Sequence, residues 1–200
     1  EGDVYRHTML VLKNAKPGVD NQLAALLHDV GKPVSQQILA DKIQFLGHEE
    51  VGAEMAEAIM RRLKFDSNTI QKVKKMVQTH MRPHVLSDAS PKALRKFIRE
   101  VGEDMVGSIM DLAEADQLGN LPPKNLIPDL RKRLEEVVDV PIKKNPVLNG
   151  KEVMDILHLR PGKEVGEAIQ FLKDKEDEYA LDGKILTKDE AKSLLLWEYK

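Results

Sequence analysis

The chain has 200 residues, of which 42% are hydrophobic, 32% are charged and only 4% are aromatic, a mixture typical of a folded helical protein rather than a disordered one. Its formal net charge of -2 argues against a strongly basic nucleic-acid-binding protein, although clusters of basic residues can still occur on part of its surface. Because the chain contains no cysteine, disulfides, thiolate metal sites and cysteine nucleophiles are excluded, and a reducing cytoplasm is the expected location. No apolar run approaches the ~20 residues of a membrane helix, so no membrane partner is expected. Since the chain opens on Glu1 rather than Met, we expect a fragment of a longer protein or a trimmed product.

Helical periodicity dominates the first 118 residues, where apolar residues recur at spacings of three and four. Pro17 and Gly18 separate a first helix from a second, which Gly31 and Pro33 end. Residues 38–45 have some strand character, but one such run cannot build a sheet. Further helices are predicted at about 48–63, from the turn 66–68 to 81, from Ser90-Pro91 onward, and at 104–118. The predicted fold class is all-α, with a helical bundle over residues 1–118.

The remainder of the chain predicts a connector and a small helical unit. Residues 119–149 are rich in proline and polar residues and contain one amphipathic segment at 130–138. Short helices are expected beyond them, at 151–157, 163–178 and 188–199. The predicted organisation is therefore a domain at 1–118, a Pro-rich connector at 119–149 and a helical C-terminal subdomain at 150–200.

Ionisable residues occupy the apolar faces of several helices predicted in the first block. His28 and Asp29 are adjacent at the end of the apolar run 23–27, and other such residues lie in helical register with apolar neighbours. Ionisable groups in a core are costly unless they are paired or bound to a metal. A single histidine on an apolar helix face is more often a core residue whose hydrogen bonds are made within the protein. Several histidines and aspartates on such faces together favour a shared metal site. Its predicted ligands are His7, His28, Asp29, His48, His80 and Asp116, of which His48 and His80 could instead contact substrate around a single metal.

These residue types indicate the chemistry of the predicted site. Imidazole and carboxylate ligands together suit Mn, Fe, Co, Ni or Zn better than Mg or Ca, and one or two such ions are predicted. With two ions, Asp29 would serve as a bridge, and a hydroxide held between them could attack phosphorus at neutral pH. Lys32, which follows the pair closely, could hold a phosphate oxygen or the leaving group, or it could merely be a helix C-cap cation. Asp29 and Lys32 are the predicted catalytic residues.

Other basic residues are candidates for binding the substrate. Arg82 and His84 follow the helix that ends near residue 81, and each could instead be an ordinary surface residue. Residues 92–99 place several basic side chains on one helix face, which predicts either a solvated surface or contacts of Arg95 and Arg99 with a phosphate backbone. The acidic run 174–178 is expected to be solvated.

The ligand pattern resembles the HD-domain metal-dependent phosphohydrolase superfamily, whose core pattern is H…HD…D and whose two-metal members carry added histidines. Here His28 and Asp29 form the HD pair, and His7 and Asp116 match the outer positions. The surrounding sequence is similar to the HD body and C-terminal region of bacterial tRNA nucleotidyltransferases and poly(A) polymerases, at residues 1–8, 23–33, 47–49, 79–81, 115–116, 148–150 and 159–162. The resemblance covers most of the chain and implies an HD-type helical bundle.

One large departure from that resemblance bears on function. Polymerase activity in the family belongs to an N-terminal head, where a Gly-Ser turn precedes an Asp-x-Asp pair on a strand. Gly107 and Ser108 fall in a helical segment with no Asp-x-Asp after them, so nucleotide addition by this chain alone is not expected. The resemblance implies instead a phosphomonoesterase or 2′,3′-cyclic phosphodiesterase acting on a nucleotide or RNA end. The alternative is an RNA-binding body, with tRNA as its partner, whose HD site is not catalytic. The oligomeric state stays open.

Overall fold

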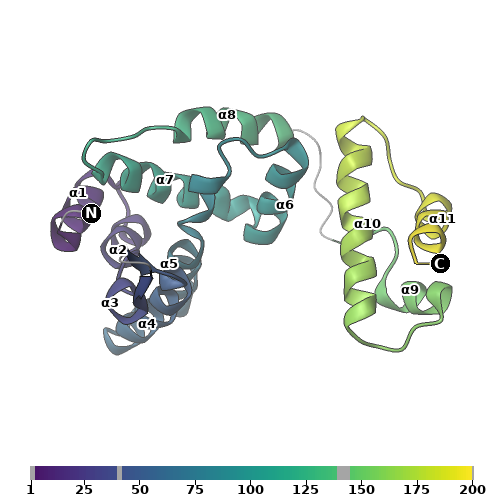
Figure 1. The fold of residues 1–200 in the computed structure, drawn as a ribbon, viewed down its shortest axis with the longest axis horizontal. Helices are drawn as coiled ribbons and strands as arrows, with labels where there is room; N and C mark the ends of the chain where they lie inside the picture. Colours follow the sequence, from purple (N-terminus) through teal and green to yellow (C-terminus); the bar gives the residue numbers. More distant parts are fainter. Residues whose placement is uncertain (1–2, 40–41, 139–144, 200) are drawn as a thin grey trace. The chain divides into compact units, whose positions relative to one another are not determined.

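The computed structural model describes residues 3–39, 42–138 and 145–199, and it is mostly helical, as predicted (Figure 1). Its contacts divide the chain into two compact units, one comprising residues 1–88 and 101–132 and the other residues 89–100 and 133–200. This division differs from the predicted boundaries at 118 and 149, because residues 89–100 group with the later part of the chain. The predicted domain organisation stays a prediction, and part of its connector, residues 139–144, lies outside the described residues.

The first unit is built around α5 (Ser67–Thr79), which contacts α2 (Val19–Leu27), α4 (His48–Arg62) and α7 (Glu103–Gly119), while α1 (Val4–Asn14) packs on α2 and α7. These helices form because apolar residues recur on one face of each, and those faces meet in a core that includes Val11, Ala25, Ala56, Val73 and Ile109. α5 begins at the turn 66–68, as predicted, and there the Asp66 side chain accepts a hydrogen bond from the backbone N–H of Thr69. A short 3-10 helix, η1 (Arg82–Val85), contacts α7.

Residues 36–45 form the main exception to the all-α prediction. Strand β1 (Gln36–Leu39) pairs antiparallel with β2 (Lys42–Phe45), and Ile38 lies opposite Ile43. The expectation that a single run cannot build a sheet was wrong here, because the run folds back and pairs with itself. The residues between the strands, 40 and 41, lie outside the described part of the chain.

The second unit contains α6 (Pro91–Val101), α9 (Gly150–Leu157), α10 (Lys163–Leu181) and α11 (Lys188–Glu198), and the division between the units falls within α8 (Ile127–Val138). The helices predicted at 151–157, 163–178 and 188–199 are confirmed. Capping boxes begin α9 and α11, in which Asn149 and Thr187 exchange hydrogen bonds with glutamates three residues later. The apolar core of this part comprises Leu148, Val153, Val165, Ala168, Leu172, Leu186, Ala191 and Leu195. Within the described residues, no helix combines the length and apolar character that crossing a membrane requires.

Gly31 lets the segment after α2 approach the start of α4. A Cβ atom on residue 31 would lie 2.6 Å from the backbone nitrogen of Gly52 and would also overlap the carbonyl oxygen of His48. Both neighbours are backbone atoms of α4, so neither can move without shifting the helix. The absence of a side chain at residue 31 therefore brings His28 and Asp29 beside His48.

Gly31→Ala is expected to destabilise the first unit by about 1–3 kcal/mol, as overpacking of a tight core does. Thermal and denaturant unfolding would measure the change. Gly107→Ala is the matched control, because a Cβ atom at this position of α7 meets nothing within 4 Å. Alanine in a helix is more stable than glycine by about 1 kcal/mol, so this control should unfold at or above the wild-type temperature. Equal stability of Gly31→Ala and wild type would contradict the close approach.

Candidate metal centre

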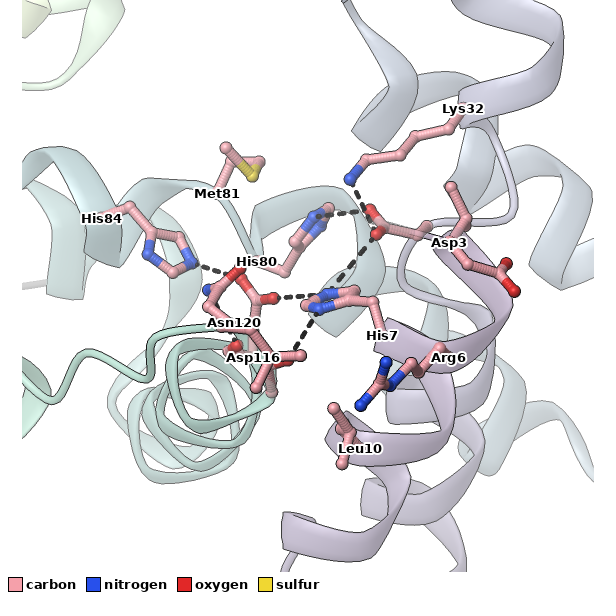
Figure 2. Close-up of a pocket in the computed structure, with 14 residues that line it drawn as sticks. Asp3, Arg6, His7, Leu10, Lys32, His80, Met81, His84, Asp116 and Asn120 are labelled. Atoms are coloured by element: carbon pink, nitrogen blue, oxygen red, sulfur yellow. Dashed lines mark hydrogen bonds and ion pairs between the residues drawn. The ribbon is translucent and has the colours of Figure 1, made fainter. Parts of the chain in front are cut away.

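The six predicted metal ligands come from five segments of the first unit and meet in one place, part of which Figure 2 shows. α1 supplies His7, the residues after α2 supply His28 and Asp29, and α7 supplies Asp116. His48 is the first residue of α4 and His80 caps the C-terminus of α5. The ligands thus sit within helices or at their ends, where the packed backbone fixes their positions.

The ligands form two groups on either side of the Asp29 carboxylate. His7, His28 and Asp116 make one group and Asp29, His48 and His80 the other, and within each group one potential ligand atom per residue lies within 4.8 Å of the others. Asp29 Oδ2 is 3.2 Å from His28 Nε2, whereas Asp29 Oδ1 is 3.5 Å from His48 Nε2. One oxygen of Asp29 therefore faces each group, which is the placement of a carboxylate that could bridge two ions.

Backbone carbonyls set the orientation of three of the histidine rings. The Nδ1 atoms of His28, His48 and His80 lie 2.8, 2.7 and 2.6 Å from the carbonyl oxygen three residues earlier in each case. Because a carbonyl oxygen only accepts, these Nδ1 atoms carry a proton, and the Nε2 atom of each ring faces the centre. This is the usual arrangement of metal-ligating histidines.

The spacing of the Nε2 atoms tests whether a cation fits. His28 Nε2 lies 3.3 Å from His7 Nε2, and His48 Nε2 lies 3.4 Å from His80 Nε2. Two imidazole nitrogens that share one ion at ~2.0–2.1 Å in tetrahedral geometry are separated by about 3.3 Å. Asp29 Oδ2 is also buried and accepts no hydrogen bond with proper geometry, although Lys32 Nζ lies 2.8 Å from it. The four imidazoles and the unsatisfied carboxylate oxygen therefore fit one or two divalent cations.

Electrostatics hold these side chains in the forms that bind metals. Burial raises the pKa of Asp29, but the neighbouring His28 and Lys32 outweigh it and bring the pKa well below its usual range. Burial likewise opposes the lowering of the Asp116 pKa, which hydrogen bonds from His7 and His84 cause. Burial lowers the pKa of His80 to about 4. Both carboxyls are thus ionised and His80 is neutral at neutral pH, as ligation requires.

His7 differs from the other histidines because it reaches the edge of the site. Its Nε2 lies 2.9 Å from Asp116 Oδ1, and this contact raises the pKa of His7 above its usual value. Its Nδ1 lies 3.3 Å from the carbonyl oxygen of Gly119. Without a cation, a proton on His7 compensates part of the negative charge of the two buried carboxylates.

A cavity of about 550 Å³ opens onto the centre. The ligands His7, Asp29, His80 and Asp116 line it, while His28 and His48 are not among its lining residues. The predicted catalytic Lys32 also lines the cavity, and its Nζ lies 5.6 Å from the centre of the Phe45 ring. The remaining lining is partly apolar and includes Val4, Leu10, Met81 and Leu121.

The structure places some of the residues that were predicted to bind substrate at the cavity, and others away from it. His84 lines the cavity beside Asp116, whereas Arg82 is not among the lining residues. Arg6 and Asn120 line the cavity too and were missed by sequence reasoning. Arg6 precedes His7 on the exposed side of an amphipathic helix, and a charged residue in that position is indistinguishable from ordinary surface.

Arg95 and Arg99 contact a carboxylate of the chain, so the expectation of a solvated face was wrong for them, whereas their contact with a phosphate backbone stays a prediction. Both belong to the second unit, and Arg95 is only 1% exposed. Arg95 Nε donates to Asp177 Oδ1 at 3.1 Å, and Arg99 donates to Asp177 Oδ2. The expectation that the run 174–178 is solvated was also wrong for Asp177, which is 3% exposed.

Comparisons with known proteins identify the family of this chain and two of its relatives. The family pattern of the HD domain matches residues 4–121, more than half of the chain. A CC-adding tRNA nucleotidyltransferase of Thermus thermophilus is 36% identical over 184 residues, which are 90% of this chain and 40% of that protein. An A-adding tRNA nucleotidyltransferase of Deinococcus radiodurans is 32% identical over 183 residues, which are 85% of this chain and 42% of that protein. The chain spans about two-fifths of the length of these curated relatives.

No solved structure matches the chain. The family match begins at the start of α1 and ends just beyond α7, so it includes all six residues of the centre. The positions that the sequence pattern identified are thus the positions that the fold brings together, and the chain belongs to the HD-domain family.

Proposed function

We propose that this chain is a metal-dependent phosphohydrolase, of the phosphomonoesterase or 2′,3′-cyclic phosphodiesterase type, that acts on a nucleotide or an RNA end. The observation that supports the proposal is the Asp29 carboxylate, which faces a ligand group on each side at a cavity that also contains Lys32.

Two ions fit the ligand groups better than one. His7, His28 and Asp116 would hold one ion, His48 and His80 would hold the other, and Asp29 would contribute an oxygen to each. The mixture of imidazole and carboxylate favours Mn, Fe, Co, Ni or Zn. When bound, such ions supply Lewis-acid chemistry, which polarises a phosphoryl oxygen and lowers the pKa of water enough for attack at neutral pH.

The side chains around the cavity have separate roles in this proposal. Lys32 places an ammonium group 2.8 Å from Asp29 Oδ2, where it can neutralise the charge of a phosphate bound at the centre. Arg6 offers a second cation on the same cavity, suited to another phosphate oxygen. At about 550 Å³ the cavity is within the range of small-molecule sites, so a single nucleotide or a terminal nucleotide is the expected occupant.

The proposal is tested with the purified chain loaded with Mn, Co or Ni and assayed on 2′,3′-cyclic nucleotides and an aryl phosphate ester. Hydrolysis is expected with at least one metal, and a chelator should remove it. Lys32→Ala should lower kcat/KM by about 10–100-fold, because one cation that stabilises the transition state is lost. Its metal content should stay at the wild-type value, because Lys32 is not a ligand.

Lys72→Ala is the matched control for charge, since Lys72 is about half exposed on the surface of the first unit and pairs only loosely with Asp20 at 3.6 Å. It should hydrolyse these substrates at the wild-type rate. A metal-loaded wild-type chain that turns over none of the substrates with any of the metals would contradict the proposed activity.

A second function is favoured by the comparisons, because both relatives named above are tRNA nucleotidyltransferases. In this alternative the chain is the body that holds tRNA, and its metal centre is not catalytic. With a net charge of -2, the chain alone is expected to bind tRNA weakly at physiological salt, with an affinity that falls steeply as salt rises. Binding titrations over a series of salt concentrations would measure this. A tight tRNA complex, combined with no hydrolysis, would make the alternative the better account.

A further inference from the structure

The Gln117 side chain has one fixed orientation beside the metal centre. Gln117 follows Asp116 on α7 and is only 5% exposed. The backbone N–H of Leu126 donates to Gln117 Oε1 at 2.7 Å. Because a backbone N–H can only donate, the amide oxygen must face Leu126 and the amide nitrogen must face the other way.

The orientation of Gln117 determines which nitrogen of His84 carries the proton. Gln117 Nε2 lies 3.4 Å from His84 Nδ1, and an amide nitrogen can only donate. His84 Nδ1 is therefore the acceptor, so the proton of the imidazole is on Nε2. This is the opposite tautomer to that of His28, His48 and His80, whose Nδ1 atoms carry the proton. His84 is thus arranged to donate toward the centre rather than to bind an ion.

The atom that faces His84 Nε2 is an oxygen of a predicted ligand. His84 Nε2 is buried and makes no hydrogen bond of proper geometry, but its contact with Asp116 Oδ2 is short, at 2.8 Å, and Figure 2 shows the ring turned toward that carboxylate. The other oxygen, Asp116 Oδ1, lies 2.9 Å from His7 Nε2 and 3.8 Å from His28 Nε2. The two oxygens of Asp116 therefore point in different directions, one to the ligand group and one to His84.

We propose that His84 is a positioning residue for the metal centre, which holds Asp116 Oδ2 so that only Oδ1 faces the ligand group, and that Gln117 selects the tautomer that does this. The inference rests on the metal site of the proposed function. Groups that orient a ligand from outside the first coordination shell commonly change metal affinity by about 10–100-fold. A carboxylate free to turn would lose this alignment with His7 and His28.

Metal affinity tests the proposal without any assay of activity. His84→Leu should weaken binding of Co or Zn by about 10–100-fold in competition with a chromogenic chelator. His84→Gln should recover most of the affinity, because its amide nitrogen can donate to Asp116 from a similar position. Thermal unfolding in excess chelator separates a folding defect from a binding defect. Gln170→Leu on α10 is the control for loss of a glutamine, and it should bind metal as the wild type does.

The tautomer gives a second, spectroscopic measurement. The long-range ¹H–¹⁵N spectrum of the zinc-loaded chain should show His84 protonated at Nε2, and His28, His48 and His80 protonated at Nδ1. Gln117→Glu should place a proton on His84 Nδ1, because the new carboxylate accepts from both Leu126 and His84.

The possible outcomes separate this inference from the proposed function. A wild-type chain that binds no metal would overturn both. A wild-type chain that binds metal, together with a folded His84→Leu variant of equal affinity, would overturn only the role of His84. A wild-type His84 protonated at Nδ1 would overturn the role of Gln117.

Discussion

Asp29→Ala is expected to abolish retention of metal at both ligand groups, the largest effect of any single change at the centre. The carboxylate is the one ligand that faces both groups, with Oδ2 at 3.2 Å from His28 Nε2 and Oδ1 at 3.5 Å from His48 Nε2. Removing it takes a carboxylate oxygen away from both ligand groups and leaves His48 and His80 without a carboxylate in their group. Because an ion that binds only the folded chain stabilises it, the metal-loaded wild type should unfold at a higher temperature than the variant.

Elemental analysis of the purified proteins would count metal ions per chain, and thermal unfolding would be measured with and without chelator. At a metal concentration ~1,000 times the dissociation constant, the stabilisation lost is about 4 kcal/mol. Asp88→Ala is the control, since this aspartate is exposed in the same unit and lies outside the centre. Full metal content in Asp29→Ala would show that the ligand assignment is wrong.

The ligand positions could be predicted from the sequence because burial and helical periodicity place them. An apolar stripe at spacings of three and four defines the inner face of a helix, so His7, His80 and Asp116 on such stripes had to point inward. Together with the adjacent His28 and Asp29, these residues form a pattern that indicates a metal site, which a single histidine would not indicate. The two-sided placement of the Asp29 oxygens depends instead on how α2, α4 and α7 pack, and no local pattern encodes it.

The second unit shows why the prediction of solvated side chains was wrong for Arg95 and Asp177. A row of basic residues at helical spacing looks the same whether water or another helix covers it, so residues 92–99 alone could not reveal their partner. That partner, Asp177, lies 82 residues beyond Arg95 in the chain. A similar limit applies to Gln117, because its role depends on contacts with His84 and with Leu126, which only the folded chain brings together.

Asp177→Ala is expected to lower the free energy of unfolding of the second unit by about 3–5 kcal/mol, as loss of one partner from a buried ion pair does. Arg95 Nε donates to Asp177 Oδ1 at 3.1 Å and Arg99 donates to Oδ2, so truncation leaves two guanidinium groups without this carboxylate. Arg95 also donates to the carbonyl oxygen of Val137 at 3.0 Å, a contact that the substitution does not remove and that cannot supply the missing negative charge. Denaturant unfolding followed by helical circular dichroism would measure the loss.

Asp174→Ala is the matched control, because Asp174 also pairs with Arg99, at 3.2 Å, but its side chain is 28% exposed. Because solvent screens that pair, its loss should lower the free energy of unfolding by less than about 1 kcal/mol. The double variant Arg95→Met with Asp177→Leu should recover part of the stability, since apolar side chains of similar size can replace a buried ion pair. If Asp177→Ala instead unfolds like the wild type and Arg95→Met reduces tRNA affinity without reducing stability, Arg95 is a phosphate contact, as its place in the basic run 92–99 first indicated.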